Sequence, residues 1–410
     1  MSNLLRPVAA LLTGTAILLL GNGLHGLVVP VRADSESFSQ MAIGVLGSSY
    51  YLGLLLGCLL NPRLIARVGH IRAFAAFSAL VAAVPLLHAL YVHVFFWSIL
   101  RFLTGVCFAG LYMGIESWLS QSTEGHSRGR ILAAYTIINL VAVPVGMQLM
   151  HLVGHSGFEP FAVISIFYSL AAVPVALTRR NAPALIPTAR LGLNRLIRVS
   201  PTAAVGCLCA GLANSAIWTM ITVYGKAVGI GPEGSATLLS VIVLAGAAGQ
   251  WTVGAISDRI GRQPVLLVMS VLGAVIGGVL FHWAPPELSW TLALGGGIGL
   301  CAFSIYPLCL AHANDRISKK RSVEVSGGLL LLFSITAIVG PSAAAVLIQL
   351  FGGGALFLVT AFAHGFLALV LIVRLKKSGA RNKATENFVP MPRTSPAVFQ
   401  LDPRANSDKS

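Results

Sequence analysis

About twelve apolar runs of roughly 20 residues follow one another along almost the whole chain. An α-helix of that length crosses the hydrocarbon core of a bilayer. Of the 410 residues, 56% are hydrophobic and 10% are charged, whereas a soluble domain carries about 25% charged residues. The sequence predicts an all-α membrane protein, and its first partner is the lipid bilayer. We expect spans near residues 8–30, 42–61, 73–92, 95–119, 131–153, 158–178, 201–225, 233–256, 264–284, 288–312, 324–350 and 353–375.

The formal net charge of +15 is concentrated in alternate connections between the spans. Of the 28 Lys and Arg residues, all but Arg32, Arg101 and Lys226 lie in the connections on the side of the N-terminus or in the tail. Because basic residues favour the cytoplasmic side, this distribution predicts an inner-membrane protein with both termini in the cytoplasm. The same distribution explains the basic charge without a nucleic-acid partner.

The longest polar connection divides the expected spans six and six. We therefore predict an N-terminal bundle over 1–178, a cytoplasmic linker over 179–200 and a C-terminal bundle over 201–375. Arginines at 190, 195 and 198 with leucines between them are typical of an amphipathic helix on the inner leaflet, or of a plain solvated linker. The tail, 376–410, is rich in Pro, Asn, Ser and charge, which predicts disorder.

The two halves repeat a loop sequence at an offset of 192 residues. The loop after the eighth span reads Gly-Ala-Ile-Ser-Asp-Arg-Ile-Gly-Arg over 254–262, and the loop after the second span reads Pro-Arg-Leu-Ile-Ala-Arg-Val-Gly-His over 62–70. The alignment pairs Gly69 with Gly261. A repeat of this length indicates two pseudo-symmetric six-helix bundles.

This topology, with the Gly-x-x-x-Asp-Arg-x-Gly-Arg loop, resembles the major facilitator superfamily. Three further stretches are similar to its YcaD-like bacterial members: Arg-Phe-Leu-Thr-Gly at 101–105, Glu-Ser-Trp at 116–118, and Ser-Arg-Gly-Arg-Ile-Leu-Ala-Ala-Tyr at 127–135. The resemblance implies the fold of that superfamily, a central cavity lined by the first, fourth, seventh and tenth spans, and alternating access. The first-half loop departs from the pattern at Pro62 and Ala66. The glycine-proline signature of drug antiporters is missing from 141–146, which argues against a drug:proton antiporter.

Polar side chains in the middle of the four expected cavity spans are the candidate substrate contacts, because a polar group facing lipid has no hydrogen-bond partner. Interhelical hydrogen bonding is the alternative for each of them. Arg101, which lies within the fourth span, is either functional or reaches the interface with its long side chain. The resemblance implies a role for it in proton or substrate coupling. The candidate cavity residues are Asn22, His25, Arg101, Tyr112, Asn214, Trp218 and Tyr306.

Charged residues near the cytoplasmic ends of the spans are candidates for gating. Glu116 is expected to pair with loop arginines as an inner latch or as a fixed anchor, and Asp258 to act in conformational change at the end of the eighth span. The candidate gating residues are Arg67, Arg72, Glu116, Arg128, Asp258, Arg259 and Arg262.

These features predict a secondary transporter of a small neutral or anionic organic solute that functions as a monomer. His25 is a candidate proton carrier, since the ordinary pKa of an imidazole is about 6.5. No cofactor or metal is expected, because no phosphate-binding loop and no His/Cys/acid cluster occurs in the sequence. The alternatives are a transporter-derived receptor or scaffold that binds without flux, and an intramembrane enzyme, for which no convergent catalytic set is present.

Overall fold

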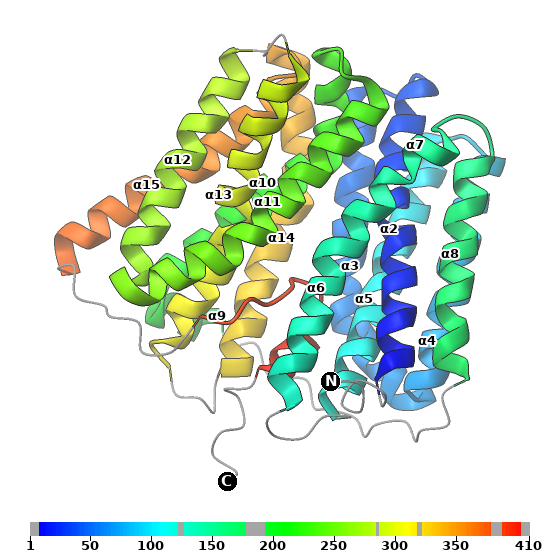
Figure 1. The fold of residues 1–410 in the computed structure, drawn as a ribbon, viewed down its shortest axis with the longest axis horizontal. Coiled ribbons are helices and arrows are strands. Elements are labelled where there is room, and N and C mark those ends of the chain that lie inside the picture. The colour runs from blue at the N-terminus through cyan, green and yellow to red at the C-terminus, as the bar shows by residue number, and fades with distance from the viewer. Residues whose placement is uncertain are drawn as a thin grey trace. The chain divides into compact units, whose positions relative to one another are not determined.

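The computed structural model describes residues 8–121, 127–177, 193–283, 287–317, 322–378 and 388–402. Helices account for nearly all of these residues (Figure 1). Their bounds are α2 Ala9–Ser35, α3 Gln40–Val68, α4 His70–Leu90, α5 Val94–Gln121, α6 Ser127–Gln148, α7 Met150–Val153, α8 Glu159–Ala176, α9 Leu193–Val199, α10 Pro201–Ala227, α11 Gly231–Ile260, α12 Arg262–His282, α13 Leu288–Asn314, α14 Ser322–Phe351, α15 Ala355–Ser378 and the 3-10 helix η2 Pro396–Leu401.

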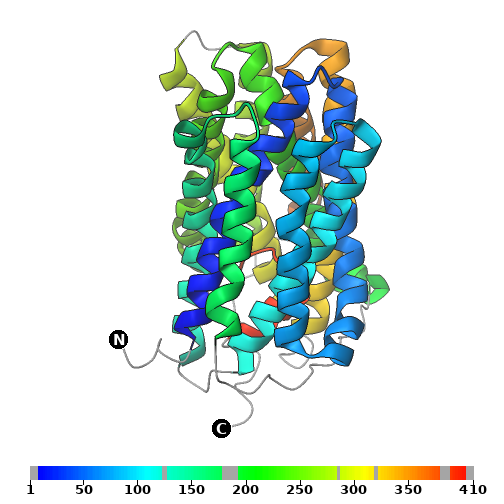
Figure 2. The same cartoon turned by 90° about the vertical axis from the view of Figure 1, so that its right-hand side faces the viewer.

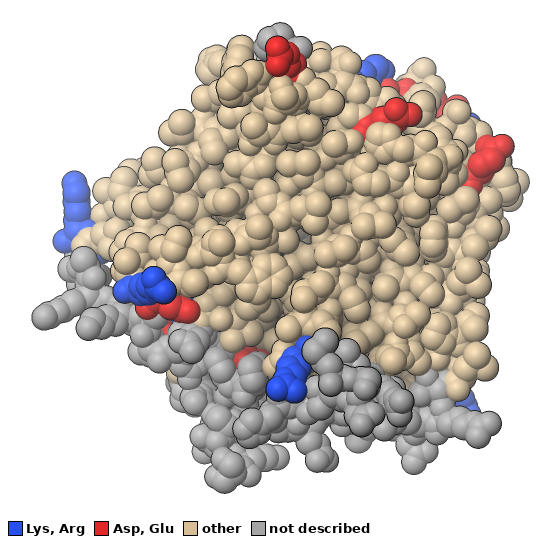
Figure 3. Space-filling view, viewed as in Figure 1, with Lys and Arg blue, Asp and Glu red and all other residues tan. Residues whose placement is uncertain are grey.

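Twelve stretches of these helices are long and apolar enough to cross a membrane within the described part of the chain. This confirms the predicted all-α membrane fold. Several helices are longer than the predicted spans, because a helix continues past the hydrocarbon core into the polar interface. On the face drawn in Figure 3, the described charged side chains lie near the ends of helices, with uncharged surface along the helices between them.

The chain forms two compact units. The first comprises Met1–Val29, Ser49–Arg190 and Met391–Ser410. Within it, α4 packs against α5 and α8, and η2 packs against α5 and α6. The long helices of this unit run side by side (Figure 2). Close approach depends on glycine: a Cβ at Gly53 would collide with the Phe102 carbonyl, and a Cβ at Gly105 with the Tyr50 carbonyl. These two contacts hold α3 against α5.

The second unit comprises Pro30–Ser48 and Leu191–Pro390. Within it α11 packs against α13, α10 against α14, and α12 against α15. The predicted bundle boundaries differ from these units, because Pro30–Ser48 packs with the second unit. Its contacts include Ser48 Oγ to Ser342 Oγ at 2.8 Å. They also include an ion pair between Asp34 Oδ2 and Lys226 Nζ, again at 2.8 Å.

The repeat is visible in the helix bounds. α4 and α12 are each 21 residues long, and α2 and α10 are each 27 residues long. Both pairs start and end 192 residues apart, which is also the separation between Asp34 and Lys226. The structure therefore extends the sequence repeat from one loop to whole helices.

The linker and the tail differ from the sequence-based expectations where they are described. α9 packs against α10 and α14, and Leu196 is buried. The prediction of a disordered tail is wrong for residues 388–402, because η2 buries Val398, Phe399 and Leu401. The remaining linker and tail residues, 178–192, 379–387 and 403–410, lie outside the described part of the chain.

Candidate functional site

A buried polar cluster in the first unit is built from α2, α4 and α8. His25 Nδ1 lies 3.0 Å from the hydroxyl of Tyr168, and both residues are fully buried. The His25 ring meets the ring of His88 edge to face, with centroids 5.5 Å apart. His88 Nδ1 in turn lies 2.9 Å from the carbonyl oxygen of Val84. The two imidazoles are thus fixed through one nitrogen each.

Small residues position this cluster. A Cβ at Gly21 would lie 2.9 Å from Cε1 of Tyr168, so glycine lets that ring lie against α2. A Cβ at Gly23 would collide with the Val143 carbonyl, and a Cβ at Gly146 with the Leu20 carbonyl. Close packing of α2 on α6 and α8 therefore aims His25 into the interior of the unit.

Arg101 brings a positive charge to the same region. Its side chain is 9% exposed, and its guanidinium carbon lies 4.6 Å from the centre of the Tyr50 ring on α3, within cation–π range. The guanidinium interacts electrostatically with both His25 and His88. No carboxylate among the described residues forms an ion pair with Arg101.

Two imidazole nitrogens of this polar cluster lack hydrogen-bond partners among the described residues, namely Nε2 of His25 and Nε2 of His88. Buried polar atoms are nearly always hydrogen-bonded, so such atoms mark a place for a water or a ligand. His88, Tyr50 and Tyr168 were missed by the sequence analysis. His88 could have been found, because it follows Phe77 and Val81 on the face of α4 that is buried.

The candidates in the second unit form smaller groups. Asn214 on α10 is 4% exposed, and neither its Nδ2 nor its Oδ1 has a hydrogen-bond partner in the described ranges. The Trp218 ring lies 6.4 Å from that of Phe303. Tyr306 is fully buried. The structure thus places an unsatisfied amide in the interior of this unit, and no recorded contact joins it to the two aromatic candidates.

Asn22 and Asn214 occupy equivalent positions, separated by the 192-residue offset that relates α2 to α10. Asn22 is half-buried, whereas Asn214 is buried. Tyr112 is 7% exposed and packs against the Phe108 ring, with centroids 5.7 Å apart. Each half of the repeat therefore contributes an asparagine at the same place in its first helix.

Glu116 near the end of α5 binds hydroxyl groups, not arginines. Its carboxylate is fully buried and accepts a hydrogen bond from the Tyr135 hydroxyl at 2.8 Å. It also accepts hydrogen bonds from the hydroxyls of Thr394 and Ser395 in the tail. The expected pairs of Glu116 with Arg67, Arg72 and Arg128 are not formed in the described part of the chain. The reason is geometric. Residues 391–402 cover Glu116, whereas the side chains of Arg67 and Arg72 are exposed and that of Arg128 is half-buried.

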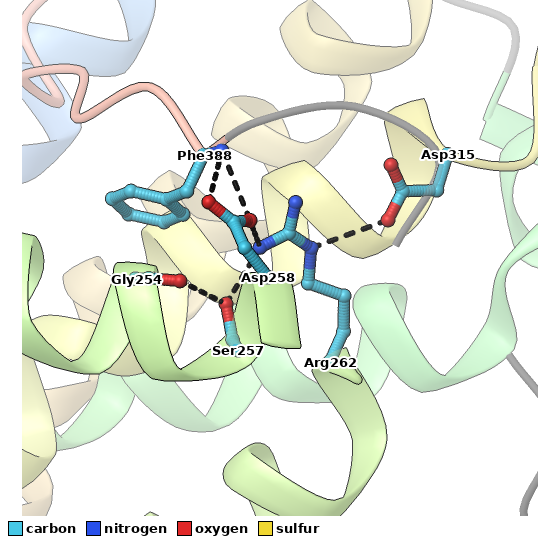
Figure 4. Close-up of polar contacts among 6 residues, drawn as sticks. All are labelled: Gly254, Ser257, Asp258, Arg262, Asp315 and Phe388. Atoms are coloured by element: carbon cyan, nitrogen blue, oxygen red, sulfur yellow. Dashed lines mark hydrogen bonds and ion pairs between the residues drawn. The ribbon is translucent and has the colours of Figure 1, made fainter. Parts of the chain in front are cut away.

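The loop between α11 and α12 holds a second charged network (Figure 4). Arg262 is 1% exposed and forms an ion pair with Asp258 through Nη1. Its Nε donates to Asp315 Oδ2 at 3.2 Å, and its Nη1 also donates to Ser257 Oγ at 2.6 Å. Asp258 further accepts the backbone N–H of Phe388 at 3.0 Å. The sequence analysis found Asp258 and Arg262 but missed Asp315, which caps the C-terminal end of α13.

Arg259 is exposed, and within the described residues no ion pair joins it to this network. Of the predicted gating residues, the structure therefore brings together Asp258 and Arg262, and leaves Arg259 at the surface. Within the described residues, no group of three or more His, Cys, Asp or Glu side chains is placed to hold a metal ion.

A twelve-span fold with a buried polar cluster and a charged loop network defines a polytopic membrane transporter. The family model of the Major Facilitator Superfamily matches residues 11–294 and 203–403, and the chain belongs to that superfamily. It is 29% identical over 390 residues to the uncharacterized MFS-type transporter YcaD of Escherichia fergusonii, covering 91% of this chain and 97% of that one. An uncharacterized MFS-type transporter of Enterobacter sp. (strain 638) is also 29% identical, over 387 residues, with the same coverage.

Solved structures share the fold. The nucleoside transporter NupG aligns with a TM-score of 0.74 at 13% sequence identity, covering 90% of this chain and 99% of that one. A bacterial homologue of the lysosomal transporter Spinster, in an inward-facing and occupied conformation, aligns with a TM-score of 0.69 at 13% identity, covering 96% and 95%. The chain is a membrane transporter, and the comparisons indicate no enzyme.

Proposed function

We propose that this protein is a secondary transporter that moves a small organic anion by alternating access around the buried polar cluster of His25, His88, Arg101 and Tyr168. The supporting observation is the unpaired charge of Arg101. A guanidinium removed from water without a counterion costs several kcal/mol. A carboxylate or similar anion on the solute would offset that cost, whereas a cation would add to it.

The imidazoles supply the remaining polar contacts in this proposal. In the neutral state each ring uses one nitrogen as donor and one as acceptor. Nδ1 of His88 donates to the Val84 carbonyl, so its Nε2 can accept an N–H or O–H group of a solute, whereas Nε2 of His25 can donate or accept according to the role of Nδ1 toward Tyr168. Proton coupling through His25 is part of the proposal as a secondary element. An imidazolium at this position would lie near the positive charge of Arg101 in a fully buried region, and repulsion between the two charges disfavours protonation of His25. A bound anion would offset this repulsion and so favour protonation.

The gating residues complete the cycle. Basic residues near the end of α5 and the start of α6 support a cytoplasmic location for those helix ends and for both chain termini. In this proposal the Asp258–Arg262 pair and Glu116 hold one facing state, and the polar cluster is exposed to each side in turn.

Solute flux into proteoliposomes tests the proposal. Purified protein is first screened by thermal shift against small carboxylates, neutral nucleosides and amines, and the stabilising compounds are then assayed as radiolabelled substrates. We expect a carboxylate to be transported, and Arg101→Met to reduce its uptake at least tenfold. Arg101→Lys, which retains the charge, serves as the matched control and should retain more uptake than Arg101→Met.

Two results would contradict the proposal. Equal uptake by native protein and Arg101→Met would remove the anion-binding role of this residue. Binding of the carboxylate without flux would favour the receptor or scaffold. For His25, uptake is compared with and without an imposed pH gradient: a gradient dependence that survives in His25→Ala excludes this residue as the proton carrier.

A further inference from the structure

The tail segment 388–402, here called the C-terminal strap, is anchored by hydrogen bonds to two buried or half-buried carboxylates. In the first unit, Thr394 and Ser395 donate hydroxyl hydrogen bonds to Glu116, one to each carboxylate oxygen. In the second unit, the backbone N–H of Phe388 lies 3.0 Å from both oxygens of Asp258. The strap thus uses the acidic residues of both candidate gating elements.

Apolar contacts strengthen each anchor. Met391 and, in η2, Val398, Phe399 and Leu401 are all at most 2% exposed, so this part of the strap is packed closely against the first unit. The Phe388 ring occupies the space beside Gly254 that a Cβ would need, and lies 5.9 Å below the guanidinium of Arg262. Gly254, the first glycine of the loop motif, therefore leaves room for the ring of Phe388.

The start of η2 is shaped for this position. Ser395 caps the helix by accepting the N–H of Ala397 at 3.2 Å, while its hydroxyl hydrogen points to Glu116. At the other end, the hydroxyl of Ser120 on α5 donates to the carbonyl oxygen of Gln400 at 3.3 Å. The Ser395 hydroxyl thus accepts a hydrogen bond from the backbone of η2 and donates one to the buried carboxylate of Glu116.

We propose that the surface of the first unit around Glu116 and Ser120 is a binding site for the chain's own C-terminal strap, which acts as a removable lid over the inner end of α5. The hydroxyls of Thr394 and Ser395 compensate the burial of the Glu116 carboxylate.

The lid is tested by the access of a thiol reagent to position 120 in the full-length protein. Ser120→Cys is introduced alone and together with Thr394→Val and Ser395→Ala, which remove both hydroxyls and leave the apolar contacts. We expect N-ethylmaleimide to modify Cys at this position at least tenfold faster in the triple variant. The chain with its six native cysteines gives the background rate. Thr394→Ser with Ser120→Cys, which keeps a hydroxyl, should behave as Ser120→Cys alone.

Amide hydrogen exchange of residues 391–402 gives a second readout in protein without the cysteine substitution. We expect strong protection in the native chain and at least tenfold faster exchange in Thr394→Val/Ser395→Ala. Exchange in the native chain as fast as in a free peptide, or equal labelling of position 120 with and without the hydroxyls, would overturn the proposal. Neither measurement needs a transported solute, so a failure of the lid proposal can be distinguished from a failure of the proposed transport function.

Discussion

The loop between α3 and α4 and the loop between α11 and α12 share a backbone but differ in the side chains around it. Gly69 has φ 87° and ψ 158°, and Gly261 has φ 102° and ψ 153°. The next residue starts a 21-residue helix in both halves. In the second half that residue is Arg262, with three described partners. In the first half it is His70, which is 4% exposed and whose side chain forms no hydrogen bond or ion pair within the described ranges.

The difference teaches that glycine alone suffices for the turn, and that the charges serve another purpose. A left-handed, extended conformation of this kind is accessible almost only to glycine. In addition to the glycine turn, the second half has ion pairs of Arg262 with Asp258 and Asp315, which join α11, α12 and the end of α13. The first half, which has Ala66 where the second has Asp258, makes the turn without such a connection.

The largest effect is expected for Asp258→Ala. This change leaves the buried guanidinium of Arg262 with Asp315 as its remaining acid, and we expect the free energy of unfolding to fall by about 3 kcal/mol. His70→Ala is the matched change in the first half and should cost less than about 1 kcal/mol by comparison. Unfolding in mixed micelles with increasing SDS measures both. Equal losses would show that the charged network contributes nothing beyond its apolar contacts.

The two glycines should respond alike. Gly69→Ala and Gly261→Ala each place a Cβ in the strained region, which costs about 1–3 kcal/mol. The same SDS titration applies, and Gly129→Ala is a suitable control, since a Cβ there meets nothing within 4 Å and this residue has no positive φ. A large difference between the two loop glycines would mean that the shared backbone is held by different forces.

A graft of the second-half pair into the first half sharpens the comparison. His70→Arg alone buries an unpaired charge, whereas His70→Arg with Ala66→Asp restores the i, i+4 spacing of Asp258 and Arg262. We expect a favourable coupling energy of about 1 kcal/mol in a double-mutant cycle. Zero coupling would show that the first-half turn does not direct the two side chains toward one another.

The smallest effect is expected for the ion pair between Asp34 and Lys226, which is exposed. The side chains are 34% and 67% exposed, so solvent screens the attraction. Lys226→Met should change the unfolding free energy by less than about 1 kcal/mol, and added salt should have little effect on the variant. A loss as large as that of Asp258→Ala would contradict the distinction between buried and exposed pairs.

Hydropathy predicted the twelve spans, and the loop repeat predicted the two halves, because both depend on residues close together in the chain. Partners distant in the chain were not predictable in this way. Glu116 was expected to meet Arg128, which is near in sequence, but the structure gives it Thr394 and Ser395 from the far end. Although the tail as a whole is polar, it contains the short apolar run Pro-Ala-Val-Phe-Gln-Leu at 396–401, which could have predicted that this segment is buried. Tyr168 was missed because its contact with His25 depends on packing between helices that are distant in the sequence.

Two helices are shared between the compact units: the boundary falls after Val29 within α2 and after Ser48 within α3. The backbone of both helices is therefore continuous across the boundary between the units. Pro30 lies at the boundary in α2 and lacks the N–H that would complete the backbone ladder, so it forms a soft point there. At two places, then, a single unbroken helix and not a loop joins one compact unit to the other.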